Sequence, residues 1–140
     1  MMPDMESIKK HFSENDRFCS LNGIKLIEVE EGRAITRLTV EDRHLNGLDI
    51  IQGGAVFTLA DLAFAAASNS HGNAAVGIST TMSHFKAARK GDVLTAEARE
   101  ISRNHKLGTY LVDIKNSQDE LIATFQGMVY IKKDSFPPEL

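Results

Sequence analysis

The sequence predicts an α+β fold in which one long buried helix is wrapped by an antiparallel sheet of about six strands. Two observations lead to this prediction. Residues 54–70 read as a helix that is apolar nearly all the way round, which is typical of a helix enclosed by its own domain. The segments on either side alternate between apolar and polar residues, the period of a half-buried strand. One helix with a series of hairpin-connected strands gives an α+β layer arrangement.

Two strands are expected before the helix and four after it. Residues 24–30 and 33–40 are joined at Glu31-Gly32, which is a tight hairpin signal. A sheet of this kind leaves edges and one face to cover, so we expect a homodimer or a homotetramer. After the helix the alternation begins at Val76, and turn signals separate the strands at 90–92, 104–108 and 116–119.

The two ends of the chain are expected to lie outside the main fold of a single domain, residues 1–140. Residues 1–21 read as an N-terminal helical extension, with Ile8 and Phe12 on one face of a short helix. Residues 133–140 read as a frayed tail. The N-terminus lacks the apolar run of a signal peptide.

The composition argues against several kinds of partner. The chain has 16 Lys and Arg against 19 Asp and Glu, and without a basic excess we expect no nucleic-acid partner. Because no apolar stretch is long enough to span a bilayer, we expect no membrane partner either. The single cysteine, Cys19, cannot form an internal disulfide, which fits a reducing compartment. We therefore expect a cytoplasmic protein in which Cys19 is a small apolar filler.

Asp61 is the only charged residue of the apolar helix. Burying an unpaired carboxylate costs on the order of several kcal/mol, so the group is paired, exposed in a cleft or kept for chemistry. In a structural interpretation, its carboxylate is satisfied by the hydroxyls of Thr58 and Ser79. In a functional interpretation, Asp61 belongs to an active site, because perturbed buried carboxylates cluster there.

The motif Gln52-Gly53-Gly54 stands where the helix begins. The first N–H groups of a helix have no partner inside it and carry the positive end of the helix dipole. Glycines let a ligand approach these groups, which can then hold a developing oxyanion. The alternative interpretation is an ordinary glycine-rich helix start.

Together these motifs resemble those of a known family. Asn46-Gly47, then Gln52-Gly53-Gly54, Leu59-Ala60-Asp61 and Gly91-Asp92, are similar to the pattern of hotdog-fold acyl-CoA thioesterases of the phenylacetate-degradation type. The resemblance implies a long helix wrapped by a curved antiparallel sheet. It also implies hydrolysis of acyl- or aryl-CoA thioesters with no metal or redox cofactor, by dimers or tetramers with active sites at the subunit interface.

The resemblance also implies roles for five residues. Asp61 matches the catalytic carboxylate, and Gly53 matches the residue whose backbone N–H polarises the thioester carbonyl. Asn46 matches a polar residue that orients the nucleophile or the thioester, and Ser79 a hydroxyl that holds the attacking water. Asp61 and Ser79 would come from one subunit, with Asn46, Gln52 and Gly53 from the other. The family usually has His-Gly-Gly, and Gln52 can hydrogen-bond as histidine does but cannot titrate.

The phosphates of CoA need cations, and two basic turns are candidates. If the two turns lie near one another, they suit a dianionic phosphate and a pyrophosphate. Solvated hairpin tips are the alternative interpretation. The residues expected to bind substrate are Gly54, Lys86, Arg89, Lys90, Arg103 and Lys106.

Other functions are weighed against the thioesterase. None of the five histidines forms a close metal-ligand pair, so no metal is expected, and His44 is expected to be a loop residue facing solvent. A non-catalytic acyl-CoA-binding hotdog protein remains an alternative, although such sensors usually carry a DNA-binding segment and residues 1–21 are too few for one. A hotdog dehydratase would need a catalytic histidine where Gln52 stands.

Overall fold

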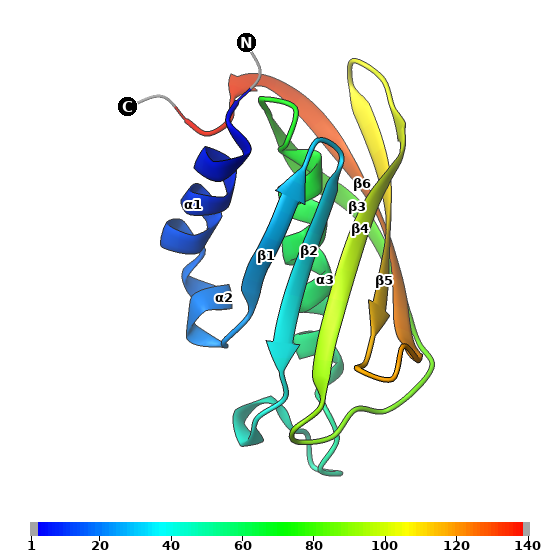
Figure 1. Cartoon of the computed structure of the whole chain (residues 1–140). Helices are drawn as coiled ribbons and strands as arrows, with labels where there is room; N and C mark the ends of the chain where they lie inside the picture. Colours follow the sequence, from blue (N-terminus) through cyan, green and yellow to red (C-terminus); the bar gives the residue numbers. More distant parts are fainter. Residues whose placement is uncertain (1–2, 139–140) are drawn as a thin grey trace.

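The computed structural model describes residues 3–138. Residues 1–2 of the predicted N-terminal extension and residues 139–140 of the predicted tail lie outside this range. One long helix, α3, is wrapped by a curved six-stranded sheet (Figure 1), which confirms the predicted α+β hotdog fold. All strand pairs are antiparallel, and the strand order is β1-β2-β4-β5-β6-β3. The elements are α1 Met5–Asn15, α2 Arg17–Leu21, β1 Lys25–Glu30, β2 Arg33–Thr39, the 3-10 turn η1 Asp42–His44, α3 Gly53–Ser68, β3 Asn73–His84, β4 Val93–Arg103, β5 Leu107–Lys115 and β6 Leu121–Ser135.

Small side chains let the sheet close around α3. The helix buries a series of alanines, among them Ala60, Ala63 and Ala67, each with no exposed surface. The hydroxyl of Thr36 on β2 donates to the carbonyl oxygen of Leu59 at 2.7 Å and satisfies a buried polar pair. No helix within residues 3–138 is both long and apolar enough to cross a membrane.

Phe64 fixes the distance between α3 and the far side of the sheet. A Cβ atom built on Gly127 of β6 would lie 2.6 Å from the Phe64 ring, and one built on Gly77 of β3 would lie 3.2 Å from it. Only glycine therefore leaves room for the ring at position 127. The same ring stacks edge-on against Tyr110, with ring centroids 5.8 Å apart.

Strand β3 forms one edge of the sheet and is exposed over most of its length. It pairs only with β6, and its register shifts between Gly77 and Ser79. Val76 and Ile78 are 47% and 55% exposed, although the alternation of the sequence predicts a buried face. An apolar edge strand of this kind is a surface that natural proteins normally cover.

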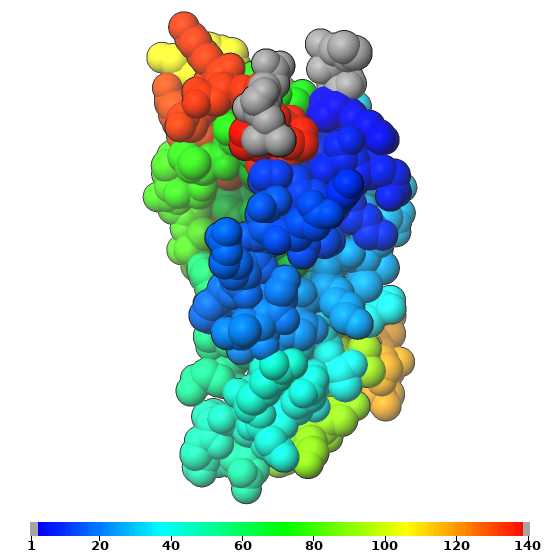
Figure 2. Space-filling view, turned by 90° about the vertical axis from the view of Figure 1, so that its left-hand side faces the viewer, coloured from blue at the N-terminus to red at the C-terminus, as the bar shows by residue number. Residues whose placement is uncertain are grey.

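The N-terminal extension contains two helices, where the sequence predicts one short helix. Asp4 accepts a hydrogen bond from the N–H of Glu6 and caps α1, and Asp16 accepts one from the N–H of Cys19 and caps α2. Ile8 is fully buried and Cys19 is 5% exposed, so Cys19 fills the core as expected. Figure 2 shows this segment lying over one face of the molecule, beside the loop that leads to α3.

The C-terminal segment is more ordered than a frayed tail. Strand β6 runs to Ser135, and the N–H of Phe136 donates to the carbonyl oxygen of Gly72 at 2.9 Å. The Phe136 ring packs against His11 and Phe12 of α1, with centroids 5.0 and 5.3 Å away. This aromatic contact joins the two ends of the chain, a contact between distant residues that sequence periodicity does not predict.

Candidate active site

The beginning of α3 holds two backbone donors in different states. The side-chain oxygen of Gln52 accepts a hydrogen bond from the N–H of Gly53 at 3.1 Å, and Gln52 is the N-cap. The N–H of Gly54 has no acceptor among the described residues. The helix start therefore presents one unoccupied donor and one held only by an exposed amide, as an oxyanion site requires.

Hydrogen bonds within the loop before α3 hold its shape. The Asn46 side-chain oxygen accepts from the N–H of Leu48 at 2.8 Å, so this oxygen is already engaged. Leu45 and Ile51 form an isolated bridge across the loop. The N–H of Ile51 donates to Ala88 at 2.8 Å and ties the loop to the connection between β3 and β4. The Asn46 side-chain nitrogen has no acceptor within residues 3–138.

The expectation that His44 faces solvent is wrong, because its side chain is buried and forms hydrogen bonds with two backbone groups. His44 is 3% exposed. Its Nδ1 accepts from the N–H of Glu41 at 2.9 Å, so the proton lies on Nε2, which donates to the carbonyl oxygen of Asn22 at 2.7 Å. The N–H of Gln52 in turn donates to the carbonyl oxygen of His44 at 2.8 Å. His44 therefore links the N-terminal extension to the residue that begins α3.

The carboxylate of Asp61 is half-buried and has no partner. No described residue donates a hydrogen bond to it or places a cation within 4.0 Å of it. Thr58, a partner in the structural interpretation, instead donates to the carbonyl oxygen of Gly54 at 2.8 Å. Burial raises the pKa of Asp61, and the negative charge of Asp16 on the N-terminal extension raises it further. These features are typical of a functional carboxylate.

Two contacts between α3 and the edge strand β3 lie on either side of Asp61 along the helix. Strand β3 returns alongside α3 (Figure 1), with His84 beside Gly53 at one end and Gly77 beside Phe64 at the other. Asp61 lies between Gly53 and Phe64 on the helix, and Ser79 lies between Gly77 and His84 on the strand. Asp61 and Ser79 therefore both lie on the stretches of α3 and β3 between these two contacts.

Gly53 and Asp61 are too far apart in one chain to act on the same carbonyl group. They are separated by eight helical residues, or about 12 Å at roughly 1.5 Å per residue. Reacting groups need to lie within about 3 Å of the atoms they act on. A single chain therefore carries both halves of the expected site without bringing them together.

His84 lies beside the start of α3, a neighbour of Gly53 that sequence reasoning missed. Its ring atoms Cε1 and Nε2 lie 3.6 Å from the position of a Cβ atom on Gly53. The side chain is exposed and has no hydrogen-bond partner within residues 3–138. Nothing in the sequence marks His84, because the contact depends on β3 returning to the start of α3.

The two basic turns lie far apart within a chain, so the condition for a joint phosphate site is not met in one subunit. Lys86, Arg89 and Lys90 lie between β3 and β4, at the end where α3 begins. Arg103 and Lys106 lie in the β4–β5 hairpin at the opposite end (Figure 1), beyond a strand of roughly 33 Å. In the first group, Lys86 pairs with Glu120 and Lys90 pairs with Asp42.

A second polar cluster lies at the end of α3 away from these donors. Glu100 accepts hydrogen bonds from Tyr110 and His71, both at 2.6 Å, and His71 also lies 3.3 Å from Glu31. Although burial opposes it, the bonds from Tyr110 and His71 lower the pKa of Glu100. Among residues 3–138, no three His, Cys, Asp or Glu side chains are grouped so as to hold a metal ion.

The fold is the hotdog fold, and comparison with known proteins identifies the family. The model of the thioesterase superfamily matches residues 48–123. The chain belongs to this superfamily.

The chain is similar to curated proteins and to solved structures. The acyl-coenzyme A thioesterase PaaI of Escherichia coli is 40% identical over 114 residues, covering 81% of each chain. A solved structure of the E. coli PaaI protein from the phenylacetic acid degradation operon has a TM-score of 0.90, with 94% of this chain and 95% of that chain covered at 34% identity. A protein of Archaeoglobus fulgidus, provisionally assigned as an esterase, is 42% identical over 96% of this chain and 87% of its own length.

Proposed function

We propose that the protein is an acyl-CoA thioesterase, which hydrolyses acyl- or aryl-CoA thioesters to a free acid and CoA. The observation that carries the proposal is the half-buried, unpartnered carboxylate of Asp61, set in an otherwise apolar helix. The E. coli relative named as an acyl-coenzyme A thioesterase supports the choice of substrate. The lone, buried thiol of Cys19 fits a place of action in the reducing cytoplasm.

In the proposed reaction, Asp61 acts as a base on water. Its carboxylate takes a proton from a water held by the hydroxyl of Ser79, and the hydroxide oxygen bonds to the thioester carbon. The carbonyl oxygen becomes an oxyanion, which accepts hydrogen bonds from the N–H groups of Gly53 and Gly54. The carbon–sulfur bond then breaks, the CoA thiolate leaves, and a proton returns to the sulfur. Only water is consumed, and the mechanism uses no metal or redox cofactor.

The separation of about 12 Å between Gly53 and Asp61 supports an active site built from two subunits. In the proposal, one subunit supplies Asp61 and Ser79, and its partner supplies Asn46, Gln52 and Gly53. The open β3 edge, with Val76 and Ile78 exposed, is the surface that we propose joins the subunits, and two such dimers form a tetramer.

The phosphates of CoA are proposed to bind at the end of the molecule where α3 begins. Arg89 is exposed there, and its guanidinium group has no acidic partner within 4.0 Å among residues 3–138. Lys86 and Lys90 flank it, although both share their charge with an acidic neighbour. Arg103 and Lys106 lie at the other end, so they reach the same CoA only from another subunit.

Thiol release from a panel of acyl-CoAs, from acetyl to long-chain and aryl esters, tests the reaction. The proposal predicts turnover of at least one class. A specific observation favours a second candidate, a non-catalytic acyl-CoA-binding protein, because Gln52 already engages the Gly53 N–H. Binding of acyl-CoAs without release of thiol from any of them would support the second candidate and contradict the first.

A charge placed on the β3 edge tests the two-subunit site. Ile78→Lys should give a monomer in sedimentation and lose most activity, because an unpaired ammonium group opposes burial. Ile101→Lys is the matched control, since Ile101 is 53% exposed on β4, within the sheet rather than at its edge. A monomeric native protein with full activity would contradict the proposal.

A further inference from the structure

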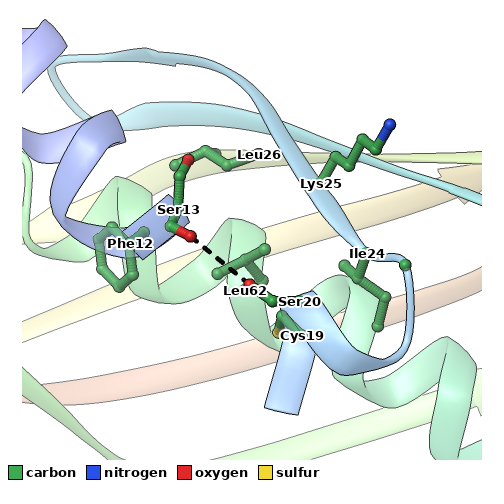
Figure 3. A pocket seen from close by; sticks show the side chains of 9 residues that line it. Phe12, Ser13, Cys19, Ser20, Ile24, Lys25, Leu26 and Leu62 are labelled. Atoms are coloured by element: carbon green, nitrogen blue, oxygen red, sulfur yellow. Dashed lines mark hydrogen bonds between the residues drawn. The ribbon is translucent and has the colours of Figure 1, made fainter. Parts of the chain in front are cut away.

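Two hollows lie between the N-terminal extension and α3. The first, of about 250 Å³, is lined on the helix side by Gly54, Ala55 and Thr58. Its opposite wall includes Phe18 of α2 and Ile24, the residue before β1. The second hollow, of about 340 Å³, lies further along α3 at Leu62, and Figure 3 shows Cys19 and Ile24 among its walls. Ile24 lines both hollows.

The first hollow begins at the oxyanion site. Gly54, whose N–H has no acceptor among the described residues, is part of its lining, and so is the N-cap residue Gln52. A thioester carbonyl held by the first N–H groups of α3 therefore has this hollow beside it. A substituent on the carbonyl carbon can enter this hollow and contact the apolar part of its lining, which is formed by Ile24, Ala55 and the Phe18 ring.

The wall facing α3 comes from the N-terminal part of the chain. Phe18 and Ile24 precede residue 48, where the match to the family model begins. Phe18 is 64% exposed and stands at the rim, and Ile24 is 5% exposed and closes the inner end. An aromatic ring exposed beside a hollow is a common feature of sites that bind apolar ligand groups.

We propose that the first hollow binds the acyl group of the substrate, and that Phe18 and Ile24 set the size of acyl group accepted. This inference rests on the proposed function. A hollow of about 250 Å³ is smaller than the clefts of roughly 300–1,000 Å³ that hold drug-sized ligands, which favours a compact acyl group. The preferred substrates are therefore esters of compact acids, such as a six-carbon acyl chain or a single aromatic ring. Because Ile24 lines both hollows, it is the residue that we expect to keep long chains out of the second one.

The test compares kcat/KM for acetyl-, hexanoyl-, benzoyl- and hexadecanoyl-CoA. The native protein should prefer hexanoyl- and benzoyl-CoA over hexadecanoyl-CoA by at least about tenfold, which corresponds to roughly 1.4 kcal/mol. Phe18→Ala should reduce this preference about tenfold by removing the ring at the rim. Ala55→Leu narrows the hollow and should reduce kcat/KM for benzoyl-CoA at least about tenfold more than for acetyl-CoA.

Leu21→Ala is the matched control. Leu21 lies on the same short helix, is 76% exposed and lines neither hollow. The ratios of kcat/KM between the four acyl-CoA substrates should be the same in Leu21→Ala as in the native protein. Ile24→Ala should raise the relative activity with hexadecanoyl-CoA, and circular dichroism checks that this core variant folds. If Ile24→Ala does not fold, the variants at the exposed Phe18 and the half-buried Ala55 keep the test decisive.

The outcomes separate this inference from the proposed function. Turnover with the same acyl-size ratios in the native protein, Phe18→Ala and Ala55→Leu would overturn the inference and leave the thioesterase proposal standing. If no ester is turned over, the proposed function fails, and the same ratios are read from acyl-CoA affinities measured by calorimetry. Affinities that do not depend on acyl size in any variant would then overturn the inference as well.

Discussion

The side-chain oxygen of Gln52 accepts a hydrogen bond from the backbone N–H of Gly53, at a distance of 3.1 Å. This bond satisfies a helix-start donor that has no partner inside the helix. A substrate oxygen bound at Gly53 must take the place of the Gln52 oxygen. Because the Gln52 side chain is exposed, it can move aside into solvent without leaving a buried polar group unpaired.

Replacing Gln52 with histidine tests whether the site needs a titrating group at this position. If the side chain only forms hydrogen bonds, Gln52→His should keep kcat within about tenfold of the native value, or about 1.4 kcal/mol of barrier. Steady-state kinetics over a range of pH measures the effect. A gain of several orders of magnitude would show that a titrating group was missing and that the native protein is a poor enzyme or a binding protein.

Gly127→Ala tests the packing of α3 against β6. The added methyl group would lie 2.6 Å from the Phe64 ring, which is held in the core, so we expect a loss of about 1–3 kcal/mol in the free energy of unfolding. Denaturant unfolding measures it. Gly47→Ala is the control, because a Cβ atom there meets nothing within 4 Å, and its stability should be unchanged. Equal stability of the two variants would contradict the tight Phe64 contact.

Glu100→Gln should destabilise the protein at neutral pH and much less in acid. The folded protein lowers the pKa of Glu100. The carboxylate therefore contributes stability above its unfolded pKa of about 4.3, and this contribution is lost as pH falls through the lower folded value. We expect a loss of about 1–3 kcal/mol at pH 7, in the range for hydrogen bonds to charged groups.

The control for Glu100→Gln is Glu120→Gln, which removes an exposed ion pair with Lys86 and should change the free energy of unfolding far less. Denaturant unfolding at several pH values between 3 and 8 is the measurement. An effect of Glu100→Gln that stays constant over this range would show that the cluster with His71 and Tyr110 does not depend on the charge.

Asp61→Asn should act on stability in the opposite direction. The folded protein raises the pKa of Asp61, so the neutral carboxyl favours folding below the unfolded pKa of about 3.9. This contribution is lost as pH rises through the higher folded value. The asparagine variant should therefore be more stable than the native protein at pH 7 and lose that advantage in acid. Lower stability at pH 7 would indicate that the carboxylate makes stabilising contacts.

Much of the fold follows from local pattern in the sequence. The apolar run of the central helix and the hairpin at Glu31-Gly32 need only short-range physics, and both elements form where they are expected. The exposure of Val76 and Ile78 could not be predicted in this way. A strand at the edge of a sheet has the same alternation as one in the middle, and strand order depends on the whole chain.

The candidate site was predictable only where local sequence patterns mark its residues. Asp61 and Gly53 are recognisable because a charge in an apolar helix and glycines at a helix start are local anomalies. The contact of His84 with Gly53 and the burial of His44 arise from chain segments that meet only after folding. The distance between the two basic turns depends on the length and direction of β4, which motif spacing does not give.

The most direct test of the central claim is the effect of Asp61→Asn on turnover and on binding. The substitution keeps the shape and the hydrogen-bonding capacity of the side chain but removes the base. We expect kcat for a thioester substrate to fall by a factor on the order of 10² to 10⁴, while the affinity for a non-hydrolysable CoA analogue stays close to the native value. Full activity in Asp61→Asn would contradict the account and leave Asp61 with a structural role.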